Sequence, residues 1–256
     1  MEGGNIVIKL GGSVITDKTV PYKIEENNIR HIVLDLERYG KKNYILIHGG
    51  GSIGHYLVNV LGLNLPNKSV NLAHVAKITN EMDKLTNIII EEFLEKDIPV
   101  ISMPTHTFLT TDTNGFKSVD FSSIKTAFSL GYVPLLRGDV VFDSERGFSI
   151  ISGDDLVLLL ATEFNASQVI MLTDVDGVIG SDSVVIKKLN LSENYQNMIW
   201  HNKDRHDVTG GILKKLDVMK ILVKKGIKVC ILSPRIQGRL LNALLGKPFV
   251  GTEVVI

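Results

Sequence analysis

The sequence predicts an α/β fold, namely an open three-layer αβα sandwich with a mainly parallel central sheet. Short β-branched apolar segments alternate with segments whose apolar residues follow helical spacing along nearly the whole chain. Several strand-like segments are apolar throughout, as expected when helices cover both faces of a parallel sheet. No internal repeat or long linker interrupts the alternation, so we expect a single domain over residues 1–256.

The first half of the chain shows this alternation clearly. NIVIKL at 5–10 predicts the first strand, and the apolar spacing at 25–39 predicts an amphipathic helix that ends at Gly40. The elements expected next are a strand at 43–48, a helix from Ser52 or Gly54 to about 62, a helix ending near 96 and a strand at 99–103.

The second half is less regular at its start. Residues 105–121 are rich in Thr, Asp, Ser and Asn and predict a loop or a short hairpin, and a second hairpin is expected around 144–147. The other expected elements are helices at 122–130, 154–164, 212–225 and 236–245, and strands in VPLLRG and at 168–173, 227–232 and 249–255. Residues 180–209 are polar and poorly periodic.

Composition excludes several classes of protein. The 28 basic residues balance the 28 acidic ones, which argues against nucleic acid as the main partner. Cys230 is the single cysteine, so neither an internal disulfide nor a multi-cysteine metal site can form, and we expect it in the core. The N-terminus lacks a secretory signal and no apolar run is long enough for a bilayer, so we expect a soluble, cytoplasmic protein without a membrane partner.

Two glycine-rich turns are expected at the carboxyl ends of strands, where ligands bind in open parallel sheets. One contains Gly11 and Gly12, and the other is HGGGSIGH at 48–55. Glycines let the backbone approach a ligand closely, and the free N–H groups of a helix start attract anions. Tight turns that need glycine only for positive φ are the alternative, but five glycines in two such turns favour a phosphate-binding site.

The same glycines raise the question of a dinucleotide site. Gly49, Gly51 and Gly54 spell G-x-G-x-x-G between a strand and a helix. However, no acidic residue follows about twenty positions later, and the pattern comes after the second strand. The P-loop pattern G-x-x-x-x-G-K-[ST] is absent as well. A dinucleotide-dependent oxidoreductase is therefore a weaker hypothesis.

Five segments in order resemble the amino acid kinase superfamily and, within it, the isopentenyl phosphate kinases. They are KLGGSVITDK (9–18), HGGGSIGH (48–55), SGDD (152–155), TDVDGV (173–178) and DVTGGILKK (207–215). The resemblance covers nearly the whole chain, and the closing His55 points to the isopentenyl phosphate branch. It implies an acceptor-binding lobe at about 1–165, a nucleotide-binding lobe at about 166–256 and a homodimer.

The resemblance also implies the activity, which is ATP-dependent phosphorylation of isopentenyl phosphate to isopentenyl diphosphate within isoprenoid biosynthesis. Lys9 and Lys18 would stabilise the transferred phosphoryl group, and Asp154 would orient them. The residues support this for Lys9, because a lysine inside the apolar run IVIKL is costly to bury without an anion. Asp154 is alternatively a helix N-cap, with Asp155 then favouring the helix dipole.

The remaining site residues are likewise implied by the resemblance. Gly50, His55 and Gly153 would bind the acceptor phosphate. The ATP-binding residues would be Lys9, Gly11, Gly12, Ser13, Gly51, Asp174, Gly177, Gly211 and Lys215, with Gly210 next to Gly211. Two departures stand out: Lys214 stands where relatives carry Gly or Pro, and Ile53 where they often carry Phe. His48 is interpreted as structural, and His201 and His206 as solvated.

No spacing of ligands predicts a metal site in the protein itself, so Mg²⁺ is expected to arrive with ATP; D-V-D-G is also a poor calcium loop. Two alternatives stay open. The same fold could phosphorylate another acceptor: a phosphonate, an acyl phosphate precursor or, least favoured, a nucleoside monophosphate. It could also serve as a non-catalytic binding or regulatory module, although Lys9, Lys18 and Asp154 are all present.

Overall fold

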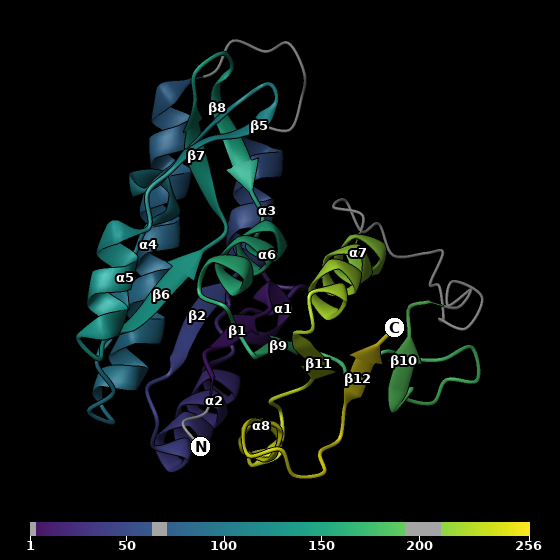
Figure 1. Ribbon diagram of the computed structural model, residues 1–256. Helices are drawn as coiled ribbons and strands as arrows, with labels where there is room; N and C mark the ends of the chain where they lie inside the picture. Colours follow the sequence, from purple (N-terminus) through teal and green to yellow (C-terminus); the bar gives the residue numbers. More distant parts are fainter. Residues whose placement is uncertain (1–3, 63–70, 193–210) are drawn as a thin grey trace.

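The computed structural model describes residues 4–62, 71–192 and 211–256, with only the backbone described at 211–214. Its central sheet confirms the mainly parallel arrangement (Figure 1). The strand order is β10-β12-β11-β9-β1-β2-β6-β3, and within it only the β11–β12 pair is antiparallel. The strands are β1 Ile6–Leu10, β2 Tyr44–His48, β3 Val100–Ser102, β6 Val133–Arg137, β9 Gln168–Leu172, β10 Lys188–Asn190, β11 Lys228–Leu232 and β12 Thr252–Val255.

Helices cover both faces of this sheet. One face packs against α1 Gly12–Ile15, α2 Glu26–Tyr39, α3 Gly51–Val60, α4 Leu72–Leu94 and α8 Arg239–Leu244. The other packs against α5 Ser122–Ser129, α6 Gly153–Glu163 and α7 Gly211–Lys224. The three layers are therefore those predicted. No helix in the described parts of the chain is long and apolar enough to cross a membrane.

Alternation along the central strand β1 decides which side chain enters which layer. Ile6, Ile8 and Leu10 belong to the apolar cluster beneath α2 and α4, whereas Val7 belongs to the cluster beneath α6 and α7. Because successive side chains of a strand point to opposite faces, Lys9 shares the face of Val7. The fold thus directs the buried lysine of IVIKL toward α6.

A second, small sheet is separate from the central one and lies in the upper part of Figure 1, beside the upper end of α4. It has the order β5-β4-β7-β8, formed by β4 Leu109–Asp112, β5 Gly115–Val119, β7 Asp139–Asp143 and β8 Gly147–Ile151. A 3₁₀ turn, Thr105–Thr107, precedes β4. Both hairpins predicted from the sequence are present. Pairing of β4 with β7, which is parallel, joins the two hairpins into one sheet.

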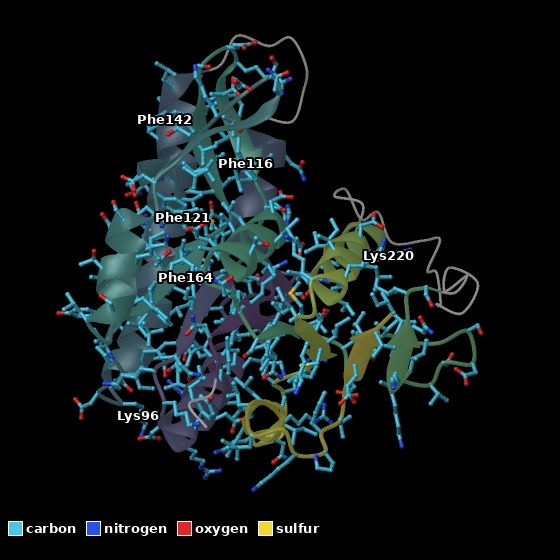
Figure 2. The ribbon with its side chains drawn as sticks, in the orientation of Figure 1. Lys96, Phe116, Phe121, Phe142, Phe164 and Lys220 are labelled. Carbon is cyan, nitrogen blue, oxygen red and sulfur yellow. The ribbon has the colours of Figure 1, made fainter. Side chains whose placement is uncertain are left out.

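Aromatic rings fill the layer between α5 and α6. The rings of Phe121 and Phe164, labelled in Figure 2, meet edge to face with their centroids 6.3 Å apart. Phe128 contacts Phe164 in the same manner at 5.7 Å. Edge-to-face pairs of this kind add roughly 0.5–1.5 kcal/mol each beyond the burial of their surface. They anchor the end of α6 opposite to the end that carries Asp154.

The structure differs from the sequence prediction in three places. Strand β10 lies within the segment expected to be irregular, where Leu189 is its one buried side chain. The four-residue α1 was not predicted, because it is too short to show a period. Helix α8 begins at Arg239 rather than 236, since Gly238 before it has φ +92° and its N–H donates to the buried Asp35 carboxylate. Cys230 is buried, as expected.

Candidate active site

Two glycine turns follow β1 and β2, which are neighbours in the sheet, and the turns pack directly on one another. A Cβ added to Gly12 would lie 2.5 Å from the backbone nitrogen of Gly51, and one added to Gly49 would lie 3.1 Å from that of Gly12. Gly51 also has φ +53°, a left-handed conformation that favours glycine. Packing alone therefore requires several of these glycines, in addition to the phosphate-binding role predicted for them.

A buried threonine joins the two turns. The Thr16 hydroxyl donates to the Gly12 carbonyl at 2.9 Å and accepts from the backbone N–H of Ser52 at 2.8 Å. It thus occupies one of the free N–H groups at the start of α3. Sequence analysis did not single out Thr16, because a threonine after a short apolar run carries no signal of a long-range contact.

Lys9 meets Asp154 at the centre of this edge of the sheet. The Lys9 Nζ donates to Asp154 Oδ1 at 2.6 Å, and the two side chains are only 8% and 13% exposed. Burial lowers the pKa of Lys9; the Asp154 carboxylate opposes this change, and the charge of Lys215 adds to it. Lys215 therefore lies near enough for its charge to act on Lys9, which brings a residue of α7 to this site.

The hydrogen bonds at the start of α6 show whether Asp154 caps this helix or pairs with a lysine. Ser152 is the N-cap, and it forms a capping box with Asp155: the Ser152 hydroxyl accepts from the Asp155 N–H, and the Asp155 side chain accepts from the Ser152 N–H. The alternative that Asp154 caps the helix is therefore wrong. Asp154 instead pairs with Lys9. Gly153, the residue before Asp154, packs against the same lysine, since a Cβ added to Gly153 would be 3.1 Å from Lys9 Cε.

Lys18 lies on an exposed loop and pairs with Asp174, which follows β9. The Lys18 Nζ is 3.4 Å from Asp174 Oδ2, and the Ser13 hydroxyl donates to Asp174 Oδ1 at 2.8 Å. Burial raises the pKa of Asp174, but the Lys18 charge and the hydrogen bonds to the carboxylate outweigh it, so that the net change is downward. Asp174 is thereby held ionised between the end of β9 and the glycine turn after β1.

The two lysine–carboxylate pairs lie at the same edge of the sheet. In the β1–β9 register Lys9 is opposite Met171, and Asp174 follows three residues later. Lys9 pairs with Asp154 and Lys18 with Asp174, so the structure shows an Asp154 contact for Lys9. The expectation that Asp154 also orients Lys18 stays a prediction.

The predicted acceptor-side residues come from three elements. Gly50 is the N-cap of α3, His55 is exposed in the second turn of that helix, and Gly153 begins α6. A Cβ added to Gly50 would lie 3.6 Å from Met82 Sδ, so α4 borders this side. Gly50 and Gly153 both flank the end of β2, since a Cβ on Gly153 would lie 3.7 Å from the His48 carbonyl oxygen.

The predicted nucleotide-side residues fall into two groups. Gly11 packs on the end of β9, where a Cβ would lie 2.5 Å from the Leu172 carbonyl oxygen. Gly177 is buried, and a Cβ there would lie 2.6 Å from Thr252 Oγ1 and 2.7 Å from Val185 Cγ1. Packing against β12 therefore explains the glycine at 177 without a ligand. Gly12, Ser13 and Asp174 remain grouped at the start of α1.

The last motif is only partly described. Gly211 begins α7, whereas Gly210, His201 and His206 lie outside the described residues, as does the side chain of Lys214. The role of Lys215, which the motif spacing favours over Lys214, therefore stays a prediction.

Arg137 is a buried residue near this edge that sequence analysis missed. It ends β6 opposite His48 of β2, and it is 1% exposed. The signal that supported the prediction for Lys9, a charged residue inside an apolar run, is present in VPLLRG as well. His48, interpreted as structural, is fully buried beside it.

A profile of the amino acid kinase family matches residues 5–233. The chain belongs to the amino acid kinase family. Among curated relatives, isopentenyl phosphate kinase of Methanocaldococcus jannaschii is 33% identical over 97% of each chain. That of Methanothermobacter thermautotrophicus is 30% identical over 97% of this chain and 98% of its own.

Solved structures agree with this family membership. A structure described as isopentenyl phosphate kinase superposes with a TM-score of 0.80 at 27% identity, covering 97% of this chain and 99% of its own. A substrate complex of isopentenyl phosphate kinase superposes with a TM-score of 0.79 at 26% identity, covering 98% and 99%. The kinase fold expected from the sequence is thus shown.

Breaking the buried ion pair should cost stability. We expect Asp154→Ala to lower the free energy of unfolding by about 3 kcal/mol, because the Lys9 ammonium loses its partner in a desolvated position. Urea denaturation measures the change. The double variant Lys9→Met, Asp154→Leu should recover most of the stability, since it removes both charges, but no kinase activity. An Asp154→Ala variant as stable as the wild type would contradict this reading of the pair.

Proposed function

We propose that this amino acid kinase transfers the γ-phosphoryl group of ATP to isopentenyl phosphate, giving isopentenyl diphosphate and ADP. One observation carries the proposal: the HGGGSIGH segment, with His55 on α3, lies beside the buried Lys9–Asp154 pair in a chain similar over its whole length to isopentenyl phosphate kinases. Acceptor-specific and charge-stabilising residues thus share one edge of the sheet.

The chemistry of a phosphate acceptor fits a site with two lysines. A phosphate monoester has its second pKa near about 6, so the attacking oxygen is already ionised at neutral pH. No general base is then needed, and the main barrier is the repulsion between two anions. Positioning and positive charge are what the protein has to supply.

The reaction would proceed in line between two sets of residues. A phosphate oxygen of the acceptor attacks the γ-phosphorus, and the bond from that phosphorus to the β–γ bridging oxygen breaks, so that the leaving charge stays on ADP. Gly50, His55 and Gly153 would bind the acceptor. The ATP would be bound by the predicted nucleotide-side residues, which are Lys9, Gly11, Gly12, Ser13, Gly51, Asp174, Gly177, Gly211 and Lys215.

Lys9 and Lys18 would divide the stabilisation of charge. Lys9 is held by Asp154 and buried, so its ammonium is preorganised and undergoes little rearrangement during the reaction. The Lys18 side chain is 60% exposed and its 3.4 Å contact with Asp174 is longer, so Lys18 can move from that carboxylate onto a phosphoryl group when substrates bind.

We propose Mg²⁺ as a companion of ATP and not as a resident ion. Among the described residues, no group of three or more His, Cys, Asp or Glu side chains lies close enough together to hold a metal. Mg²⁺ is commonly bound through substrate phosphates and retained waters, and there it neutralises charge on the β- and γ-oxygens.

An acceptor panel tests the function directly. Purified protein with Mg-ATP and isopentenyl phosphate should release ADP and isopentenyl diphosphate, measured by ³¹P NMR and a coupled ADP assay. Parallel reactions contain a phosphonate, a carboxylate acceptor and a nucleoside monophosphate. Absence of turnover with isopentenyl phosphate, together with turnover of another acceptor, would reject the assignment in favour of that acceptor.

Loss of the exposed Lys18 side chain should affect the chemical step. We expect Lys18→Met to reduce kcat roughly 10²–10³-fold, the scale of one preorganised charge-stabilising donor. The melting temperature should stay close to that of the wild type, because the side chain is exposed. Lys125→Met, an exposed lysine on α5, is the control and should keep normal kcat. A Lys18→Met enzyme with normal kcat would exclude Lys18 from catalysis.

His55 should act on the acceptor and not on the nucleotide. We expect His55→Ala to raise the KM for isopentenyl phosphate about tenfold or more, as for one hydrogen bond to a charged group, while ATP binding is retained. His55→Gln keeps an N–H donor and should recover part of the loss. Steady-state kinetics with each substrate varied in turn measure both. Equal effects on ATP and acceptor would argue against this role.

We also propose a homodimer. The outer edge of the central sheet supports it: β3 is the last strand, and Ile101, Leu130 and Tyr132 expose apolar surface there, with Leu130 71% exposed. Light scattering should give about twice the chain mass, and Leu130→Asp should shift it toward the monomer. A monomeric wild type at micromolar concentration would disprove the dimer.

A cytoplasmic location and a place in isoprenoid biosynthesis are part of the same proposal. Both rest on the substrates, since ATP is the donor and isopentenyl diphosphate is an activated five-carbon unit.

A further inference from the structure

Arg137 is connected to the glycine turn after β2 by a continuous chain of hydrogen bonds, here called the Arg137 relay. Arg137 Nη1 donates to Thr86 Oγ1 at 3.1 Å, and Thr86 Oγ1 lies 2.9 Å from His48 Nε2. His48 Nδ1 lies 3.0 Å from the carbonyl oxygen of Gly49. All three side chains are buried, so solvent does not replace these contacts.

The positions of the protons in the relay follow from its two ends. The Gly49 carbonyl can only accept, so the ring proton of His48 belongs on Nδ1. A neutral imidazole then has an unprotonated Nε2, and the Thr86 hydroxyl must donate to it. The other nearby acceptor of that hydroxyl is the Met82 carbonyl at 2.8 Å, which already receives the Thr86 N–H within α4.

The opposite assignment needs a charged ring. If the Thr86 proton were given to Met82, His48 would have to donate from both nitrogens. Burial, together with the smaller effect of the Arg137 charge, lowers the pKa of His48 to about 4 although the Gly49 hydrogen bond opposes the change, so the ring is neutral near pH 7. Every donor in the relay therefore points the same way, from Arg137 toward Gly49, and such chains polarise and strengthen each other.

The last hydrogen bond fixes a peptide plane in the turn. The peptide from Gly49 to Gly50 is trans, so its N–H points away from the carbonyl that His48 holds. Among the described residues, the Gly50 N–H has no hydrogen-bond acceptor. The Gly49 N–H and the Gly50 carbonyl on either side of this plane bond to Leu10 and Gly54, and the His48 contact holds the Gly49 carbonyl between them. When His48 holds the Gly49 carbonyl, the Gly50 N–H is therefore directed to the other side of the turn.

Arg137 is itself anchored between a helix and a strand. Its Nη1 also donates to Asp83 on α4 at 2.6 Å, and its Nε donates to Asp139 on β7 at 3.3 Å. His106 shares Asp139 at 2.8 Å. Arg137 Nη2 has no partner and is the one such buried side-chain atom among the described residues. Keeping a buried guanidinium with an unsatisfied nitrogen is unfavourable for stability, which favours a functional reason for this residue.

We propose that Arg137 is a positioning residue for the acceptor phosphate: through Thr86 and His48 it holds the Gly49–Gly50 peptide with the Gly50 N–H directed at the phosphate. The inference rests on the proposed function, because Gly50 binds the acceptor in that proposal. Arg137 acts through Thr86 and His48 and not by its own contact with the substrate. Its role is to keep one backbone donor aligned before the acceptor arrives.

Thr86 is the point at which to cut the relay with least disturbance. Thr86→Val keeps the shape of the side chain but removes the hydroxyl, and Thr86→Ser keeps the hydroxyl. We expect Thr86→Val to raise the KM for isopentenyl phosphate about five- to tenfold, the scale of one hydrogen bond, with the KM for ATP unchanged. Thr86→Ser should behave as the wild type. Equal KM values for isopentenyl phosphate in Thr86→Val and wild type, or parallel losses for both substrates, would overturn the proposal.

A spectroscopic measurement keeps the proposal testable if Thr86→Val does not fold. ¹⁵N spectra of the wild type, with His48 assigned through the loss of its signals in His48→Gln, should show Nδ1 protonated and Nε2 unprotonated at pH 7. Isopentenyl phosphate added without ATP should shift the Gly50 amide signal. A protonated Nε2, or a Gly50 signal that does not move in an active enzyme, overturns the relay. An inactive wild type with no acceptor binding instead refutes the proposed function.

Discussion

The rest of the site depends on one buried contact, the ion pair of Lys9 with Asp154. An ammonium group inside an apolar sheet is unfavourable unless an anion accompanies it, and here α6 brings that anion from 145 residues away. The strand alternation of β1 fixes the face, and the capping box of Ser152 and Asp155 fixes the start of α6. The Asp154 side chain is therefore not needed to cap α6 and pairs with Lys9.

Close backbone approach is the second constraint. The turns after β1 and β2 touch through Gly12 and Gly51, and Thr16 links them from beneath. Such contacts leave no room for side chains, so glycines that resemble a ligand cradle in sequence are also a packing requirement. Both roles are compatible, because backbone groups that pack together on one side present N–H groups on the other.

Much of this arrangement could be predicted from the sequence, for identifiable reasons. The long periodic helices and the β-branched strands have strong local signals. Lys9 was predicted through the resemblance, and its position inside an apolar run supported the prediction. Asp154 was identified as a candidate, but whether it caps α6 or pairs with Lys9 depends on a contact distant in sequence. Thr16 and β10 were not predicted. A hydrogen bond between distant turns has no local sequence signal, and a strand of three residues is too short to show a periodic pattern.

Two other residues show what residue type alone cannot decide. Arg137 carries the same signal as Lys9, yet its partners on α4 and β7 are known only once the fold brings them together. Gly177 matches a nucleotide-binding segment, but its tight packing against Thr252 and Val185 already explains it. A glycine in a motif therefore shows first that neighbouring atoms leave no room for a side chain. Whether a ligand also binds there needs separate evidence.

The strand order has an evolutionary consequence. β1 lies between β2 and β6, which lead to α3 and the relay, and β9 and β11, which lead to Asp174 and to α8. Both flanks hydrogen-bond to β1, so a substitution that shifts β1 affects the ends of both. Because β1 is buried along its whole length, we expect it to accept fewer substitutions than the border strands β3 and β10.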